Sequence, residues 1–207
     1  MKFIRNNIDR IFLALVLLVL VILLVFYAFD TLKRKKEVPE AKKIDEITEY
    51  SYYLHEDDSD LYGSIFTSLK NVLASGQVDY DEYARYLSSL FVIDFYTLNN
   101  KVTNMDIGGV QYISSHIKDN FVLKASDTIY KNVKSNIYGD RNQELPIVNN
   151  VSINSITNVS FSYGDIKDND AYEVVVLISY EKDLDYPEKV ILTLVHENNK
   201  LTVVEVK

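Results

Sequence analysis

The fold is decided by the stretch Asp79–Tyr96, which reads DYDEYARYLSSLFVIDFY. Asp79 can cap a helix, and Glu82 stands where its side chain can reach back to the cap. Val78 and Tyr83 flank the cap as a hydrophobic staple. One face of this helix carries Tyr83, Leu87, Leu90, Phe91 and Leu98, and much of the remaining circumference carries Val92, Ile93, Phe95 and Tyr96. A helix that is apolar on so many sides is predicted to run through the middle of the fold, ending near Asn99–Asn100.

The segment before it predicts a second, amphipathic helix. Apolar residues recur at helical spacing from Leu61 to Leu73, with Asp58 or Ser59 available as N-cap and Gly76 just after the last turn. The preceding run ITEYSYYLHEDD is rich in Tyr, and we expect it to be extended up to a turn at Glu56–Asp58.

Downstream, Gly108-Gly109 break the chain, after which helical spacing returns at Val110, Ile113, Ile117 and Phe121. A further short helix is expected over residues 124–135, KASDTIYKNVKS. The period then becomes two in four successive runs between about residue 148 and Lys207, separated by turn-rich segments. Helices up to about residue 135, followed by a four-stranded antiparallel meander, predict an α+β domain with the helices on one face of a curved sheet.

A different pattern occupies Ile11–Phe29, IFLALVLLVLVILLVFYAF, which has no charged residue, Gly or Pro. At about 1.5 Å rise per residue, such a helix matches the roughly 30 Å hydrocarbon core of a bilayer, so we expect a transmembrane anchor. A cleaved signal peptide is the alternative, but no small-x-small site follows the apolar run. The predicted organisation is a basic tail (1–10), a transmembrane helix (11–29), a charged stalk (30–43) and one α+β domain (44–207).

The orientation of this anchor is open. The excess of Lys/Arg after the span, Lys33 to Lys36, normally marks the cytoplasmic side. The short basic tail before the span and the absence of cysteine favour an extracytoplasmic domain instead. We therefore expect a single-pass plasma-membrane protein whose C-terminal domain is extracytoplasmic.

The net charge of −8 restricts the partners, because a nucleic-acid-binding domain needs a basic face. We expect no nucleic-acid partner. The membrane and other proteins of a membrane assembly are the expected partners, and homo-oligomerisation is left open.

The order of elements resembles a known architecture. A short basic tail, one span, a charged stalk, several helices with a long central one and a four-stranded antiparallel sheet are similar to the cone-shaped nuclear-transport-factor-two-like (cystatin-like) fold. More narrowly, the chain resembles the membrane-anchored VirB-eight/TcpC class of type IV secretion and conjugation components. The resemblance lies in architecture and implies a scaffold role in an envelope assembly. It assigns no functional residue.

The sequence offers few residues for chemistry. His55, His116 and His196 lack the spacings of metal ligands, and there is no Cys, phosphate-binding loop or nucleophile motif. No catalytic residue, metal or cofactor is expected. Asp94 is the one ligand-binding candidate, because it interrupts the apolar face of the central helix. The alternative is a carboxylate paired with a neighbouring hydroxyl, backbone amide or Lys.

Tyr50, Tyr52 and Tyr53 are candidates for a recognition surface, since aromatic residues with a polar tip are enriched at interfaces. The alternative is that these residues occupy half-buried positions in place of Phe. Three functional classes follow. The first is a membrane-anchored, non-enzymatic interaction protein. The second is a ligand-binding or enzymatic domain with a pocket near Asp94. The third is a cytoplasmic adaptor held at the membrane.

Overall fold

A computed structural model describes residues 8–33 and 41–207. The chain divides into two units, Met1–Glu40 and Ala41–Lys207. Half of the predicted stalk (30–43) and most of the predicted basic tail (1–10) lie outside the described residues.

The first unit contains helix α2 (Ile8–Lys33). Its described side chains, Phe12 to Phe26, are all apolar and all exposed. Across the described part of the chain, no helix combines the length and the apolar character needed to cross a membrane.

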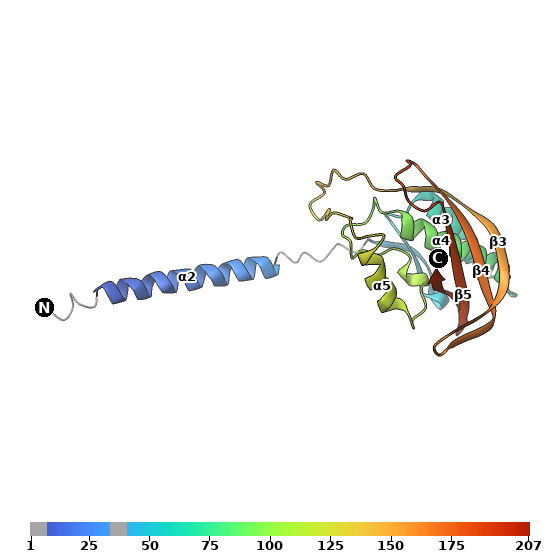
Figure 1. Ribbon diagram of the computed structural model, residues 1–207, viewed down its shortest axis with the longest axis horizontal. Coiled ribbons are helices and arrows are strands. Elements are labelled where there is room, and N and C mark those ends of the chain that lie inside the picture. The colour runs from blue at the N-terminus through green and yellow to red at the C-terminus, as the bar shows by residue number, and fades with distance from the viewer. Residues whose placement is uncertain (1–7, 34–40) are drawn as a thin grey trace. The chain divides into compact units, whose positions relative to one another are not determined.

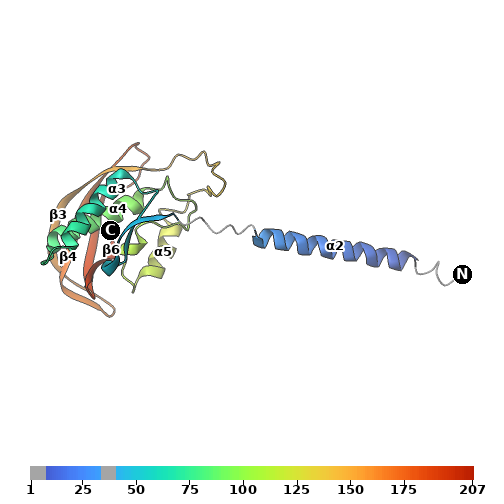
Figure 2. The same ribbon diagram turned by 180° about the vertical axis from the view of Figure 1, so that it is seen from behind.

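The second unit is an α+β domain, which confirms the predicted class. Its helices are α3 (Asp60–Leu73), α4 (Tyr80–Tyr96) and α5 (Lys118–Asp127), with 3-10 turns η1 (Thr48–Tyr50) and η2 (Val110–Tyr112). Its strands are β1 (Lys43–Ile47), β2 (Tyr52–His55), β3 (Val148–Tyr163), β4 (Ile166–Tyr180), β5 (Lys189–Glu197) and β6 (Lys200–Val206). Strands β3 to β6 form a four-stranded antiparallel sheet in sequence order, and β1 and β2 form a separate hairpin. The helices cover one face of the curved sheet (Figures 1 and 2).

Helix α4 lies at the centre of the domain, as its sequence predicts. It packs against α3 on one side and against β3, β4 and β6 on the other. The Asp79 side chain accepts hydrogen bonds from the backbone N–H groups of Asp81 and Glu82, so the predicted cap is present. Glu82 does not reach back to the cap, because its carboxylate pairs with Arg85 at 3.0 Å. The helix ends at Tyr96, since Thr97 is already extended.

Helix α3 also follows the prediction. Ser59 is its N-cap and accepts a hydrogen bond from the backbone N–H of Tyr62. Its buried stripe, Tyr62, Phe66, Leu69 and Leu73, faces the core. This is the three-and-four-residue spacing of an amphipathic helix.

The helices predicted between Val110 and Ser135 are only partly correct. The first turn at Val110–Tyr112 stops because the backbone of Ile113 and Ser114 joins the edge of the sheet, where Ser114 donates its N–H to the carbonyl of Val203 at 3.0 Å. Helix α5 begins at Lys118 and ends at Asp127, so the expected helix over residues 124–135 exists only in its first residues. The apolar spacing there reflects burial of Tyr130 and Val133 in turns.

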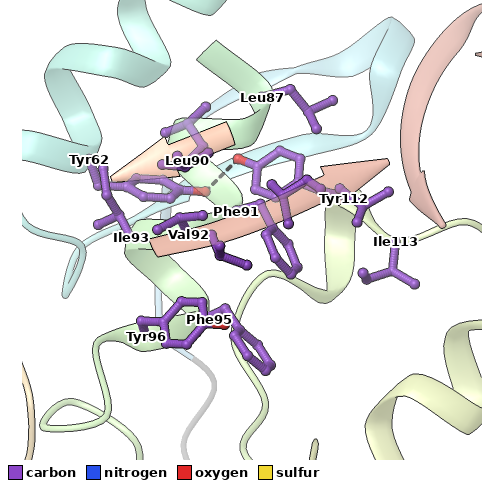
Figure 3. Packing of buried hydrophobic residues seen from close by; sticks show 14 of the residues in the cluster. Tyr62, Leu87, Leu90, Phe91, Val92, Ile93, Phe95, Tyr96, Tyr112 and Ile113 are labelled. Carbon is purple, nitrogen blue, oxygen red and sulfur yellow. Dashed lines mark hydrogen bonds between the residues drawn. The ribbon is translucent and has the colours of Figure 1, made fainter. Parts of the chain in front are cut away.

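Paired tyrosines stabilise the core. The hydroxyls of Tyr62 and Tyr112 are 2.5 Å apart and point toward one another (Figure 3). Tyr52 and Tyr83 form a second pair at 2.7 Å, which also binds the backbone of Leu201 in β6. Burial raises the pKa of Tyr62 and Tyr112 well above the ordinary value. Each hydroxyl has a partner, so the domain can bury phenols without an unsatisfied polar group.

We expect Leu90→Ala and Phe91→Ala each to lower the free energy of unfolding by about 2 to 5 kcal/mol, because each side chain is fully buried and leaves a cavity. Chemical denaturation of the full chain in detergent, followed by tyrosine near-ultraviolet circular dichroism, measures this change. The matched control is Leu123→Ala, at an exposed position of α5. Equal stability of all three variants would contradict the central position of α4.

Candidate functional site

Asp94 lies in the last turn of α4 and faces the loop that follows the helix. Its Oδ1 atom accepts a hydrogen bond from Nζ of Lys101 at 2.5 Å. Its Oδ2 atom accepts the backbone N–H of Gly109 at 2.6 Å. Both side chains are largely enclosed, with exposed fractions of 19% for Asp94 and 7% for Lys101. The carboxylate therefore fastens the loop to the helix from both of its oxygens.

The charge of Lys101 depends on this carboxylate. Burial alone would lower the pKa of the Lys101 ammonium, but the charge and hydrogen bond of Asp94 outweigh burial and raise it. Lys101 therefore stays protonated, and the pair forms a buried salt bridge.

The approach of the loop requires two glycines. Gly109 adopts a φ of 73°, a left-handed conformation that a side chain disfavours. A Cβ atom at Gly108 would overlap the backbone carbonyl of Asp94. Tyr130 completes the contact, because its hydroxyl accepts the Gly108 N–H at 3.0 Å and donates to the carbonyl of Phe95 at 2.7 Å.

A cavity of about 180 Å³ opens beside Asp94. Its walls come from the start of α3, the end of α4 and the following loop, and include Asp57, Asp58, Ser59, Tyr62, Asp94 and Asn100. Binding sites for small molecules typically have volumes of about 300 to 1,000 Å³. This cavity holds a few waters or a very small ligand.

Asp58 is the unusual titratable group of this cavity. Burial raises the pKa of its carboxyl to about 6, and the nearby charge of Asp94 acts in the same direction. The backbone N–H of His55 donates to Asp58 at 2.7 Å and limits the rise. Asp58 can therefore exchange a proton near neutral pH, whereas both oxygens of Asp94 are already engaged. An acid–base role in the cavity would fall to Asp58, which the sequence patterns did not single out.

The three tyrosines proposed as a recognition surface occupy different environments. Tyr50 and Tyr52 are core residues with exposed fractions of 8% and 0%, which corrects the expectation that they form a surface. Tyr53 is half-buried, and its ring lies 3.4 Å from Nζ of Lys43. The Tyr-rich segment fails as a surface because η1 packs Tyr50 against Tyr83 and β2 packs Tyr52 against Tyr112 in the core.

A second, more polar cleft of about 340 Å³ lies between the segment after η2 and the β3–β4 and β5–β6 turns. His196 Nδ1 is 2.8 Å from Oδ2 of Asp168, which also accepts the backbone N–H of His196. Glu197 in the same cleft accepts hydrogen bonds from Ser115 and Thr202. His196 with Asp168 and Ser115 with Glu197 are far apart in sequence, so spacing could not predict these two pairings. His116 also lines this cleft, whereas His55 lies near Asp58.

Within residues 41–207 this second cleft contains no complete catalytic arrangement. The acidic partner holds the imidazole of His196, and the Ser115 hydroxyl is already donated to Glu197. The described residues also include no group of three His, Asp or Glu side chains arranged to hold a metal ion.

Comparisons of the chain with known protein families, with curated proteins and with solved structures each find no match.

We expect Asp94→Asn to lower the free energy of unfolding by about 3 to 5 kcal/mol, because it leaves the Lys101 ammonium buried without a counter-charge. Adding Lys101→Met should restore part of the loss, since no unpaired charge then remains. Denaturation curves of the single and double variants measure both effects. Glu144→Gln is the control, because its ion pair with Lys182 lies on the surface. If Asp94→Asn is as stable as Glu144→Gln, the role of Asp94 as the counter-charge of Lys101 is contradicted.

Asp58→Asn tests the raised pKa of Asp58. The folded-state pKa of about 6 exceeds the ordinary value of 3.8, so the folded state favours the protonated carboxyl. The stability that this carboxyl adds is fully present below pH 3.8 and is lost as the pH rises through about 6. The variant should therefore gain stability relative to the unmodified chain between about pH 4 and pH 7.5. Thermal melts at both pH values measure this difference. The neighbouring exposed Asp57→Asn should gain much less, because the charge of Asp57 makes only the smallest contribution to the raised pKa of Asp58, and an equal gain in both variants would contradict the assignment.

Proposed function

We propose that the chain is a single-pass membrane protein whose domain, residues 41–207, is a non-enzymatic interaction module. In this proposal the apolar run of the sequence, Ile11–Phe29, which extends beyond the side chains that the structure describes, is the anchor. The domain binds other proteins of an envelope or secretion-type assembly outside the cytoplasm.

The apolar surface of α2 is the observation that carries the proposal. Every described side chain from Phe12 to Phe26 is apolar and exposed. The sequence extends this character from Ile11 to Phe29, which at about 1.5 Å per residue is about 28 Å of helix. An uninterrupted apolar surface of this extent is unfavourable in water and favourable in hydrocarbon. The sequence has four basic residues, Lys33 to Lys36, soon after this run, and basic residues beside a span favour anionic headgroups.

The domain supports a binding role better than a catalytic one. Asp94 holds a loop with both of its oxygens, and the cavity beside it is smaller than most small-molecule sites. The architecture, helices followed by a four-stranded antiparallel sheet, is consistent with the nuclear-transport-factor-two-like fold and the VirB-eight/TcpC class that the sequence resembles. Such components act through protein contacts.

A second candidate function is binding of a small ligand in the cavity beside Asp94. The specific observation in its favour is the carboxyl of Asp58, whose pKa of about 6 suits proton exchange or recognition of a cationic group.

Membrane fractionation tests the anchor. The chain should stay in the membrane pellet after alkaline carbonate and be released by detergent, because the anchor is held by apolar contact. Leu18→Arg combined with Val21→Arg should move it to the soluble fraction, since each central charge costs about 2.5 to 3.5 kcal/mol on insertion. The matched control places Arg at Leu123 and Ile137, two exposed positions of the domain. Release of the unmodified chain by carbonate alone would contradict the anchor.

Two further readouts separate the alternatives. A reporter that works only outside the cytoplasm, fused after Lys207, should be active, whereas activity of a cytoplasmic reporter alone would favour a cytoplasmic adaptor.

Partner proteins should co-purify with the detergent-extracted chain and be recovered equally with Asp58→Asn. A bound small molecule that is released on denaturation of the unmodified chain, and is missing from Asn100→Trp, would favour the ligand site.

A further inference from the structure

The two edges of the four-stranded sheet differ, because one is bridged at Val203 and the other has no partner among the described residues. At the β6 edge, Ile113 bridges to Val203, and the Ser114 N–H binds the Val203 carbonyl. At the other edge, β3 pairs only with β4 among the described residues. Strand β3 is the outermost strand of the sheet in both views of the domain (Figures 1 and 2).

The open strand lacks two of the protections that edge strands usually carry, charge and Pro. Natural proteins commonly place Lys, inward charges or Pro on exposed edges to prevent pairing with another chain. The sequence of β3, VNNVSINSITNVSFSY, has 16 residues with neither a charge nor a Pro. The surrounding domain is strongly charged, with 26 Asp/Glu and 15 Lys/Arg in residues 41–207.

Bulges also protect edge strands, and those of β3 divide it so that its longest regular segment has five residues. The register with β4 skips Asn149, Asn154 and Ser160. Between the second and third bulges, Ser155 to Val159 pairs without interruption with Val175 to Ala171. Thr157 stands at the middle of this segment and its side chain is exposed.

We propose that two copies of this chain pair through the β3 edge, antiparallel and centred on Thr157, to form one continuous eight-stranded sheet. In this register Thr157 faces its own symmetry mate, Ser155 faces Val159, and Ile156 faces Asn158. The contact is isologous, because each copy contributes the same surface.

The composition of β3 favours a second copy as the occupant. Two acidic domains repel one another over most of their surface, but β3 has no charge to oppose self-pairing. Its Asn, Ser and Thr side chains both donate and accept hydrogen bonds, so the strand is complementary to itself. Because the contact uses the same edge of both copies, that edge is consumed and this pairing ends at two copies. The proposal does not depend on the membrane anchor.

Disulfide trapping tests the register. The chain contains no Cys, so Thr157→Cys introduces a single thiol per copy. Opposed residues of an antiparallel pair have Cα atoms about 4.5 or 5.5 Å apart, and both distances suit a disulfide. Oxidation of the detergent-extracted full chain should give a covalent dimer on a non-reducing gel, even after dilution into excess detergent. Ser179→Cys, at an exposed position of the interior strand β4, should remain monomeric.

A charge at the same position tests the contact without oxidation. Light scattering should give the mass of two chains for the unmodified protein. Thr157→Lys should weaken self-association about tenfold or more, because it places two like charges opposite each other. Ser179→Lys should remain dimeric, and tyrosine circular dichroism should show that both variants fold. A monomeric unmodified chain, a dimer unaffected by Thr157→Lys, or equal trapping at both Cys positions would overturn the proposal.

Discussion

The domain depends on one requirement: helix α4 is apolar on most of its circumference and must be covered on every side. Its buried residues include Leu87, Leu90, Phe91 and Val92, which no single layer could enclose. Helix α3 covers one side and the curved sheet covers the other. The β1–β2 hairpin also contacts this helix, because the Tyr52 hydroxyl of β2 is 2.7 Å from the Tyr83 hydroxyl of α4.

The polar exceptions to this apolar interior hold the irregular parts of the chain in place. Asp94 connects the end of α4 to the Gly108-Gly109 turn, and the tyrosine pairs connect η2 and β2 to the core and to β6. A segment with little regular structure, such as residues 97–109, needs these specific bonds because it has no ladder of backbone hydrogen bonds. Polar groups therefore determine where the loops lie, while apolar burial determines the arrangement of helices and strands.

The sequence predicted well what depends on local periodicity and less well what depends on distant residues. The caps at Ser59 and Asp79, both helices and all four strands of the sheet follow from spacing within one segment. The helix expected after Gly109 was wrong, because the backbone of Ser114 finds a partner in Val203, about ninety residues later. Asp94 could be singled out from its place on an apolar face. The raised pKa of Asp58 and the pairing of His196 with Asp168 could not, because both depend on burial or contacts that only the folded chain creates.

The two glycines beside Asp94 also affect how this domain can diverge in evolution. Homologous domains could exchange many surface residues, and even core residues of similar volume, while keeping the fold. A side chain at Gly108 would displace the backbone of α4, and one at Gly109 would meet the ring of Phe91. Because a substitution there must be accompanied by movement of the central helix, the Gly-Gly pair with its Asp partner should persist after overall sequence similarity has faded. A search for distant relatives would therefore do better with Asp94, Gly108 and Gly109 at this spacing than with the apolar segments.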